Sequence, residues 1–124
     1  MLDGHPVLTM LPAADLDRAR ACYHDRQGLA PAQEISSAPT YESGGAHFVL
    51  ATSYGKSDGG TQASWVVDDI DAEVAALESR GVTFEEYDLP GCRTADGVCR
   101  VEGVGRAGYF EDSEGNLLSL VQFG

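Results

Sequence analysis

The residues that could carry catalytic chemistry are scattered along the chain and form no recognisable catalytic motif. The three histidines and three cysteines show no Ser/His/Asp or Cys/His order. Asp68, Asp69 and Asp71 cluster at the expected start of a helix, where capping of exposed N–H groups explains them. Glu85 and Glu86 lie on opposite faces of an expected strand. One of these two glutamates is therefore a candidate base, or a candidate partner for a cationic ligand.

The elements that position these residues follow a strand–helix–strands order. Apolar runs, helical spacing and turn residues predict the elements in this sequence: strand 7–11, helix from Asp15 to before Gly28, a weak strand 30–34, strands 40–42 and 47–51, strand 62–67, helix from Asp68 to before Gly81, strand 82–87, and strands 107–110 and 117–122. Pro12 is expected to end the first strand, because proline cannot donate to a ladder. Gly44-Gly45 is typical of a hairpin turn. Residues 89–105 are expected to be either a long loop that covers a site or a disordered segment.

This order occurs twice. Residues 62–82 have a weaker copy at residues 7–29, and the two copies align when Asp15 is placed on Asp69. The ends of the two halves repeat as well, since GGAHFVLA, beginning at position 44, aligns with EGNLLSLV, beginning at position 114. We therefore expect a single domain over residues 1–124. Its parts are module one at about 5–52, a Gly/Ser-rich linker at about 53–61, and module two at about 62–124.

The charge balance argues against nucleic acid as a partner. The net charge is −12, from 20 acidic and 8 basic residues, whereas phosphate binding needs clustered Lys and Arg. An acidic surface suits a cationic ligand. Solubility alone also explains the charge.

The chain contains no apolar run long enough to cross a membrane. We expect no secretion signal, because residues 1–11 lack a basic region followed by a long apolar stretch. With three cysteines and no CxxC motif, we expect no disulfide framework and a cytoplasmic location. Cys92 and Cys99 share one segment and could pair on oxidation, which sequence does not decide.

Three segments resemble the glyoxalase / bleomycin-resistance / extradiol-dioxygenase superfamily, also called vicinal oxygen chelate proteins. They are DLDRARACY, WVVDDIDAEVAALESRGV and FEDSEGNLLSLVQ, and the match covers nearly the whole chain. The resemblance implies an α+β fold in which two βαβββ modules form a curved, partly open mixed sheet around a cavity. It also implies a homodimer with sites at or near the subunit interface.

Metal-dependent members of this superfamily place ligands on the first and last strand of each module. The resemblance carries those ligands onto Leu8, Val49, Gln62 and Ser119. Of these, only Gln62 has a useful donor, its amide oxygen. Transition-metal sites need three or four imidazole, carboxylate or thiolate donors. We therefore expect no metal and no cofactor.

Strand alternation predicts which side chains face the cavity. If Gln62 points inward, Ser64 does too, while Trp65 faces the helices. The other predicted wall residues are Leu8, Met10, His47, Val49 and Ser119, and Tyr54, Tyr87 and Tyr109 are expected near its mouth. An apolar wall with a few polar groups is typical of a small-molecule pocket.

These residues also have simpler interpretations. Gln62 could lie at a strand end and contact only water, and His47 could be an exposed strand histidine. Ser119 could simply make room. Trp65 could stack on an aromatic ligand, although its strand parity favours packing against a helix. The tyrosines could be ordinary half-buried residues.

The leading function predicted from the sequence is a metal-free protein that binds an antibiotic or another cationic or aromatic molecule. The alternative is a lyase or isomerase of the same superfamily, acting on a small oxygenated substrate through His47, a glutamate or a noncognate metal site. The third hypothesis is a subunit or interaction module that has no ligand of its own. The fold alone does not decide between them.

Overall fold

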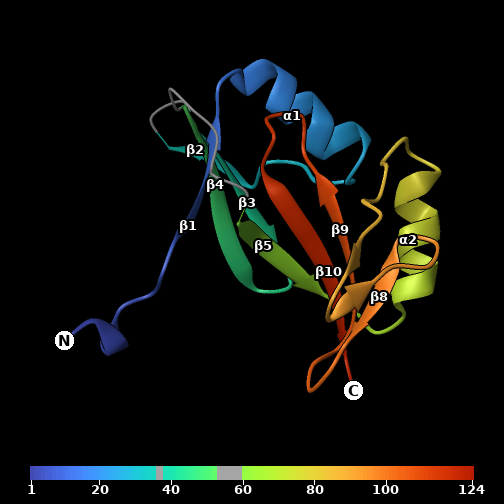
Figure 1. The fold of residues 1–124 in the computed structure, drawn as a ribbon. Coiled ribbons are helices and arrows are strands. Elements are labelled where there is room, and N and C mark those ends of the chain that lie inside the picture. Colours follow the sequence, from blue (N-terminus) through green and yellow to red (C-terminus); the bar gives the residue numbers. More distant parts are fainter. Residues whose placement is uncertain (36–37, 53–59) are drawn as a thin grey trace.

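The computed structural model describes residues 1–35, 38–52 and 60–124 (Figure 1). The predicted position of Tyr54 and most of the predicted linker lie outside these residues. The described elements are a 3-10 helix Leu2–Gly4, β1 Thr9–Ala13, α1 Leu16–Asp25, β2 Gln33–Ile35, β3 Ala38–Ser43, β4 Ala46–Thr52, β5 Thr61–Val66, α2 Ile70–Glu78, β6 Asp88–Leu89, β7 Cys92–Arg93, β8 Val98–Val101, β9 Gly105–Glu111 and β10 Leu117–Phe123.

Two four-stranded mixed sheets make up most of the fold. The first has the strand order β1-β4-β3-β2 and the second β5-β10-β9-β8, with a separate β6-β7 hairpin. In each sheet the first and last strands of a half-chain run parallel, and the remaining pairs are antiparallel. Neither sheet closes on itself, so β1 and β5 are both edge strands. The predicted α+β fold with curved, unclosed sheets is confirmed.

The strand register repeats between the two sheets. Met10 pairs with Val49 in the first sheet, and Ser64 pairs with Ser119 in the second. The two pairs are equivalent, because the sequence alignments place Met10 on Ser64 and Val49 on Ser119. The internal repeat in the sequence is therefore present in the hydrogen-bonded ladders.

Both helices begin at a capping aspartate. The Asp15 carboxylate accepts a hydrogen bond from the Arg18 N–H at 3.0 Å, and the Asp69 carboxylate accepts one from the Ala72 N–H at 3.2 Å. Each bond satisfies a backbone donor that has no partner within the helix. The equivalent aspartates of the sequence repeat thus begin equivalent helices.

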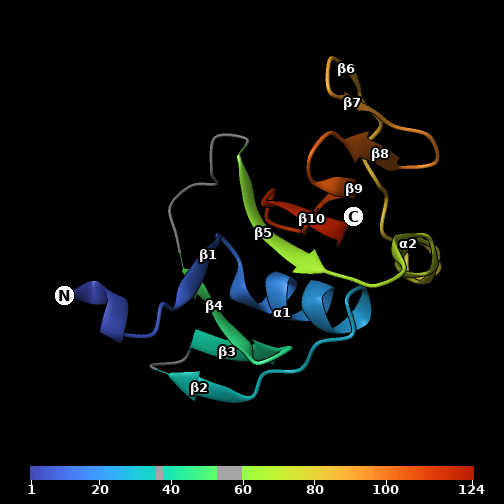
Figure 2. The same cartoon turned by 90° about the horizontal axis from the view of Figure 1, so that it is seen from below.

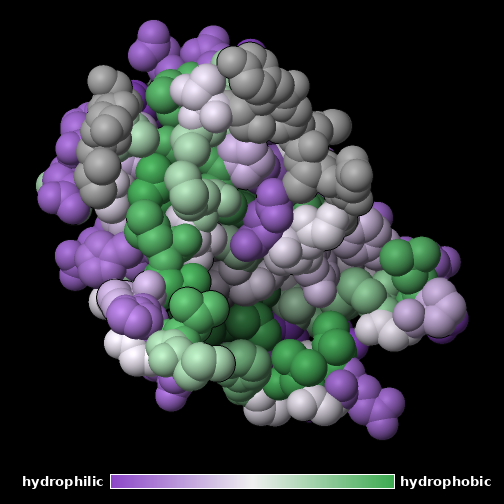
Figure 3. Space-filling view, turned by 90° about the vertical axis from the view of Figure 1, so that its left-hand side faces the viewer, coloured by the Kyte–Doolittle hydropathy of each residue, from purple (hydrophilic) through white to green (hydrophobic). Residues whose placement is uncertain are grey.

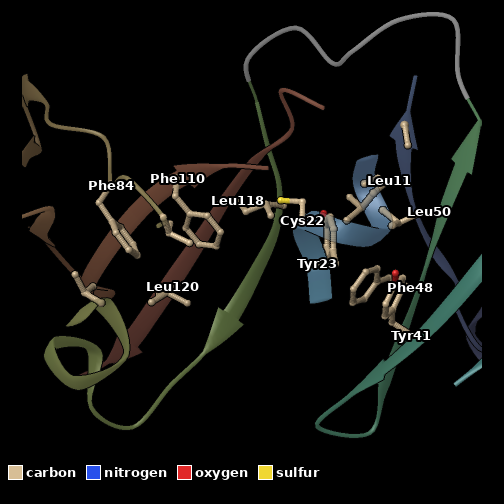
Figure 4. Close-up of a cluster of buried hydrophobic side chains, with 14 of the residues drawn as sticks. Leu11, Cys22, Tyr23, Tyr41, Phe48, Leu50, Phe84, Phe110, Leu118 and Leu120 are labelled. Atoms are coloured by element: carbon tan, nitrogen blue, oxygen red, sulfur yellow. The ribbon is translucent and has the colours of Figure 1, made fainter. Parts of the chain in front are cut away.

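Helix α1 lies between the two sheets, whereas α2 covers the outer side of the second (Figure 2). Tyr23 of α1 packs against Tyr41 and Phe48 of the first sheet, and its ring centroid is 5.7 Å from each of theirs. Figure 4 shows this group beside a second one around Phe110, with Leu118 and Cys22 between them. The core is therefore continuous from one module to the other.

A polar turn between β9 and β10 ties the second sheet to α1 and β1. The buried Asp112 carboxylate accepts a hydrogen bond from the Tyr23 hydroxyl at 2.8 Å and from the Asn116 side chain at 2.8 Å. Asn116 also donates to the Pro12 carbonyl at 2.8 Å. The sequence DSEGN, predicted only as a tight turn, thus fixes how the two modules meet.

Pro12 was predicted to end the first strand, but it does not. Strand β1 continues to Ala13, and Pro12 pairs in register with Ala51. The prediction was wrong because β1 is an edge strand, and an edge strand tolerates the missing N–H of a proline.

The segment between α2 and β9 also differs from its prediction. The residues expected as strand 82–87 form only an isolated bridge, between Phe84 and Phe110. The residues expected as a long loop or a disordered segment form β6, β7 and β8. Strand β8 pairs with β9, with Val98 opposite Gly108, while Phe84 and Glu85 meet β9 at Phe110 and Tyr109. A disulfide joins Cys92 and Cys99, with a Cα–Cα distance of 5.3 Å.

The hairpin prediction at Gly44-Gly45 is confirmed, with φ values of 57° and 83°. Such positive φ values favour glycine at both turn positions. None of the described helices is long and apolar enough to span a membrane.

Candidate functional site

A cleft of about 400 Å³ opens between the β3–β4 hairpin of the first sheet and β5 of the second. Its apolar wall comes mainly from Phe48, Trp65 and Val66. Three of the polar residues predicted for the site, His47, Gln62 and Ser64, line this one cleft, together with Thr9, Ser43, Gly44, Ala46 and Ala63. Its size lies within the range of small-molecule pockets.

Side chains from both faces of β5 line the cleft, because the cleft lies along an edge strand. Gln62, Ser64 and the 66% exposed Val66 share one face of the strand, whereas Ala63 and Trp65 pack against the core on the other. The Ser64 hydroxyl shares a hydrogen bond with the buried hydroxyl of Ser119 on the neighbouring strand β10. Ser119 therefore does not line the cleft, but its hydrogen bond orients the Ser64 hydroxyl, which does.

His47 lies at the mouth of the cleft, at the start of β4. Its side chain is half exposed, and its Nε2 is 3.7 Å from the equally exposed Glu42 carboxylate on β3. Glu42 and His47 are directly paired across the hairpin. This places a carboxylate and an imidazole on the same side of the opening.

Trp65 packs in the core, as strand parity predicts, and also borders the cleft. Its ring meets Phe48 edge-on, with centroids 6.0 Å apart, and its indole N–H donates to the Ser43 hydroxyl at 3.2 Å. The packing predicted for Trp65 is present, and the same side chain also borders the cleft, so stacking on a ligand stays a prediction. Ser43 had no signal in the sequence, because its contact with Trp65 joins residues of different modules.

The remaining predicted wall residues lie away from this cleft. Leu8, just before β1, is 46% exposed, and Met10 on β1 is 59% exposed. Val49 is buried between Met10 and Thr40 in the sheet. Figure 3 shows hydrophobic residues gathered in a band beside a hollow on the side of the molecule where β1 lies.

Tyr87 and Tyr109 form a pair near the second sheet, with ring centroids 5.7 Å apart in an edge-on arrangement. Tyr109 is paired with Ser119, so it lies two strands from β5. Burial, with the nearby Glu85 carboxylate as a smaller cause, raises the pKa of the Tyr87 hydroxyl. The Tyr87 backbone N–H donates to the Thr94 hydroxyl at 2.7 Å, which ties the Tyr87 backbone to the residue after β7.

The four positions implied for the superfamily's metal do not fit a metal ion. Val49 is apolar and buried, Leu8 is apolar, and the Ser119 hydroxyl is engaged with Ser64. Gln62 alone offers a donor, and one amide oxygen does not make a transition-metal site. Among residues 1–35, 38–52 and 60–124, no group of three or more His, Cys, Asp or Glu side chains is arranged to hold a metal.

Three solved structures share this fold over nearly their whole length. One is TnmS3, an antibiotic binding protein from Streptomyces sp. CB03234, with 22% identity over 97% of this chain and 96% of that chain and a TM-score of 0.68. Another is a lactoylglutathione lyase from Agrobacterium tumefaciens, with 19% identity over 95% of this chain and 92% of that chain and a TM-score of 0.69. The third is a glyoxalase/bleomycin resistance protein/dioxygenase from Alicyclobacillus acidocaldarius, with 22% identity over 96% of this chain and 91% of that chain and a TM-score of 0.68. No protein-family model matches the chain, and no curated protein matches it.

The chain thus has the fold of the glyoxalase / bleomycin-resistance / dioxygenase proteins, as the sequence resemblance implies. At these identities the similarity establishes the fold. Since this fold carries both binding proteins and enzymes, the function has to be argued from the cleft.

Proposed function

We propose that this protein binds a small organic molecule without using a metal, and that the ligand is an antibiotic or another flat, aromatic or cationic compound. The observation that carries the proposal is the cleft between the two sheets, where His47, Gln62 and Ser64 converge on an apolar wall. A few polar groups in such a wall orient a ligand, while burial of its apolar surface supplies affinity.

The charge of the chain and of the cleft mouth supports a cationic ligand. The net charge is −12, and Glu42 stands beside His47 at the opening. Long-range attraction of this kind raises the association rate of a cation. The similarity in fold to the antibiotic binding protein TnmS3 supports the same class of ligand.

The test is quenching of Trp65 fluorescence by a panel of natural-product antibiotics. Trp65 is the single tryptophan and borders the cleft, so a bound aromatic compound changes its emission. We expect at least one compound to bind, and Gln62→Ala to weaken it about fivefold through loss of one hydrogen bond. Gln33→Ala, on exposed β2, is the matched control. If no compound binds, or if both variants weaken binding equally, the proposal is wrong.

A lyase or isomerase is the second candidate, and the observation that favours it is the His47–Glu42 pair at the mouth. A carboxylate next to an imidazole can support proton transfer. Mass spectrometry of each bound compound after incubation separates the two functions, because a binding protein returns the compound unchanged. Elemental analysis of protein purified without chelators tests the proposal that binding uses no metal. A stoichiometric transition metal would contradict it.

We further propose that the protein works as a homodimer, since β1 and β5 are edge strands with exposed apolar side chains. A second copy would cover these edges and enlarge the wall of the cleft.

A further inference from the structure

A second, smaller cavity lies behind Trp65, on the side away from the cleft. Its volume is about 170 Å³, and most of its wall is apolar, from Leu29, Val67, Leu77, Phe110 and Leu120. The polar groups of its lining are Gln27, Ser43 and Glu73. This rear cavity lies where the segment after α1 meets β5 and α2, and the proposed binding function makes no use of it.

One side chain separates the rear cavity from the cleft. Trp65 and Ser43 line both spaces. The hydrogen bond from the Trp65 indole to the Ser43 hydroxyl, at 3.2 Å, holds the ring in place as the dividing wall. Trp65 and Ser43 are therefore the side chains that the two spaces share.

The size of the rear cavity selects a single ring. Apolar cavities of about 150 Å³ in a protein interior bind benzene. A volume of about 170 Å³ therefore suits a six-membered aromatic ring that carries one small substituent. Trp65 and Phe110 provide aromatic surface against which such a ring can pack.

A substituent that suits the rear cavity carries a positive charge, because the lining of the cavity includes the Glu73 carboxylate. Glu73 and Leu77 are four residues apart on α2, so they share one face of the helix and the carboxylate lies beside the apolar wall. The Glu73 side chain is exposed and makes no hydrogen bond or ion pair with any described residue. The carboxylate is thus available to a cation at the mouth of the rear cavity.

We propose that the rear cavity is a second small-molecule site, which binds a single-ring aromatic amine with its ring behind Trp65 and its ammonium group at Glu73. This site does not depend on the proposed function of the cleft. Benzylamine is the probe, because it has one ring and one ammonium group. Benzyl alcohol has nearly the same shape without the charge.

Titration of the ¹⁵N-labelled protein with benzylamine tests where the probe binds. We expect the signals of the Trp65 indole N–H, Val67 and Leu77 to shift together, with a dissociation constant on the order of 1 mM for a ligand of this size. Shifts confined to the cleft residues Gln62 and Ser64, or no saturable shifts, would overturn the proposal. This measurement needs no substitution, so a variant that fails to fold does not affect it.

Paired variants test the role of Glu73. Glu73→Gln is expected to weaken benzylamine about threefold, as an exposed ion pair would, and to leave benzyl alcohol unchanged. Glu78→Gln removes the same charge five residues further along α2, at the end of the helix and outside the rear cavity, and should change the binding of neither ligand. Equal weakening by both variants would mean that only the overall charge matters and would contradict the assignment.

Leu77→Trp adds a much larger ring system at the wall of the rear cavity and should strongly weaken binding of both probes, while antibiotics in the cleft still quench the fluorescence of Trp65. Ala76→Trp adds a large ring system at an exposed position of the same helix and is expected to leave both probes bound. An unchanged benzylamine affinity in a folded Leu77→Trp variant would refute the site. The two proposals therefore fail independently.

Discussion

At the scale of single residues, one carboxylate couples helix α1 to the turn between β9 and β10. The buried Glu114 side chain accepts the Asp15 backbone N–H at 2.9 Å and two hydrogen bonds from the Arg18 guanidinium, at 2.7 and 3.0 Å. The Ser113 hydroxyl donates to it as well, at 2.9 Å. The Arg18 hydrogen bonds are the main cause that lowers the pKa of Glu114 to about 2. Glu114 therefore joins residues nearly a hundred positions apart in the chain.

Substitution of Glu114 by glutamine should destabilise the protein by about 2 kcal/mol, because the buried carboxylate loses its charge and with it the charge-assisted hydrogen bonds from the half-exposed Arg18 guanidinium. Glutamine keeps the size of the side chain, so the loss reports the charge and not a cavity. Urea denaturation at pH 7 measures it. Glu102→Gln, at an exposed position, is the control and should change stability by less than about 0.5 kcal/mol. Equal effects of the two variants would show that Glu114 adds nothing beyond net charge.

The pH dependence of stability should report the same group. The folded-state pKa of Glu114 lies below its ordinary value of 4.5, so the folded state favours the ionised form. Its contribution is fully present above about pH 5 and is lost as the pH falls towards 2. The difference in unfolding free energy between wild type and Glu114→Gln should therefore shrink between pH 5 and pH 2. A difference that stays constant over this range would contradict the assignment.

At the scale of elements, the segment between α2 and β9 depends on a covalent bond. Strands β6 and β7 have only two residues each and pair with one another rather than with a large sheet. Two-stranded hairpins of this kind are marginal alone. The Cys92–Cys99 disulfide links β7 to β8, which is part of the second sheet. It thus attaches the β6–β7 hairpin, and with it Tyr87, to the body of the protein.

Reduction of this disulfide should lower the unfolding free energy by about 2 kcal/mol, as expected for a loop of this length. Hydrogen exchange should accelerate at residues 88–101 more than in β4. The Cys92→Ser/Cys99→Ala variant should lose the same stability and show no further response to dithiothreitol. If dithiothreitol destabilises that variant to the same extent, the effect comes from elsewhere. A disulfide is commoner in oxidising compartments, so the predicted cytoplasmic location needs a direct test by cell fractionation.

Local signals in the sequence were sufficient for the repeated elements and insufficient for the segment between α2 and β9. The capping residues Asp15 and Asp69 and the glycines at 44 and 45 act on neighbouring residues, and each was predicted correctly. Residues 82–87 were expected to form a strand, but they meet β9 only at Phe84 and Glu85, while β8 pairs with residues 105–108 of β9. No local pattern encodes how distant segments divide one strand edge between them.

In the candidate site, too, the features set within one strand were predicted, and the contacts between distant segments were not. Alternation along β5 correctly grouped Gln62 with Ser64 and set Trp65 on the other face. Ser43, the partner of Trp65, comes from the other module, and the sequence gives no sign of that contact. The rear cavity was missed for the same reason, because its wall is assembled from α2, β5 and the segment after α1.

At the scale of the whole molecule, the two modules leave apolar edges in solvent. Strands β1 and β5 each have a neighbour on one side only. Met10 on β1 and Val66 on β5 are 59% and 66% exposed. Exposed apolar edge strands promote association with another chain. In this setting a second copy with the same edges is the simplest self-complementary partner.

We therefore expect the protein to sediment as a dimer at micromolar concentration. Met10→Glu and Val66→Glu should each weaken the dimer at least tenfold, because they place a carboxylate in an apolar interface without a partner. Leu89→Glu, at an exposed apolar position on the β6–β7 hairpin, is the matched control and should leave the dimer intact. Sedimentation velocity over a range of concentrations measures all four proteins. A wild-type monomer at every concentration would remove the dimer from the proposal and leave the cleft to bind its ligand within one chain.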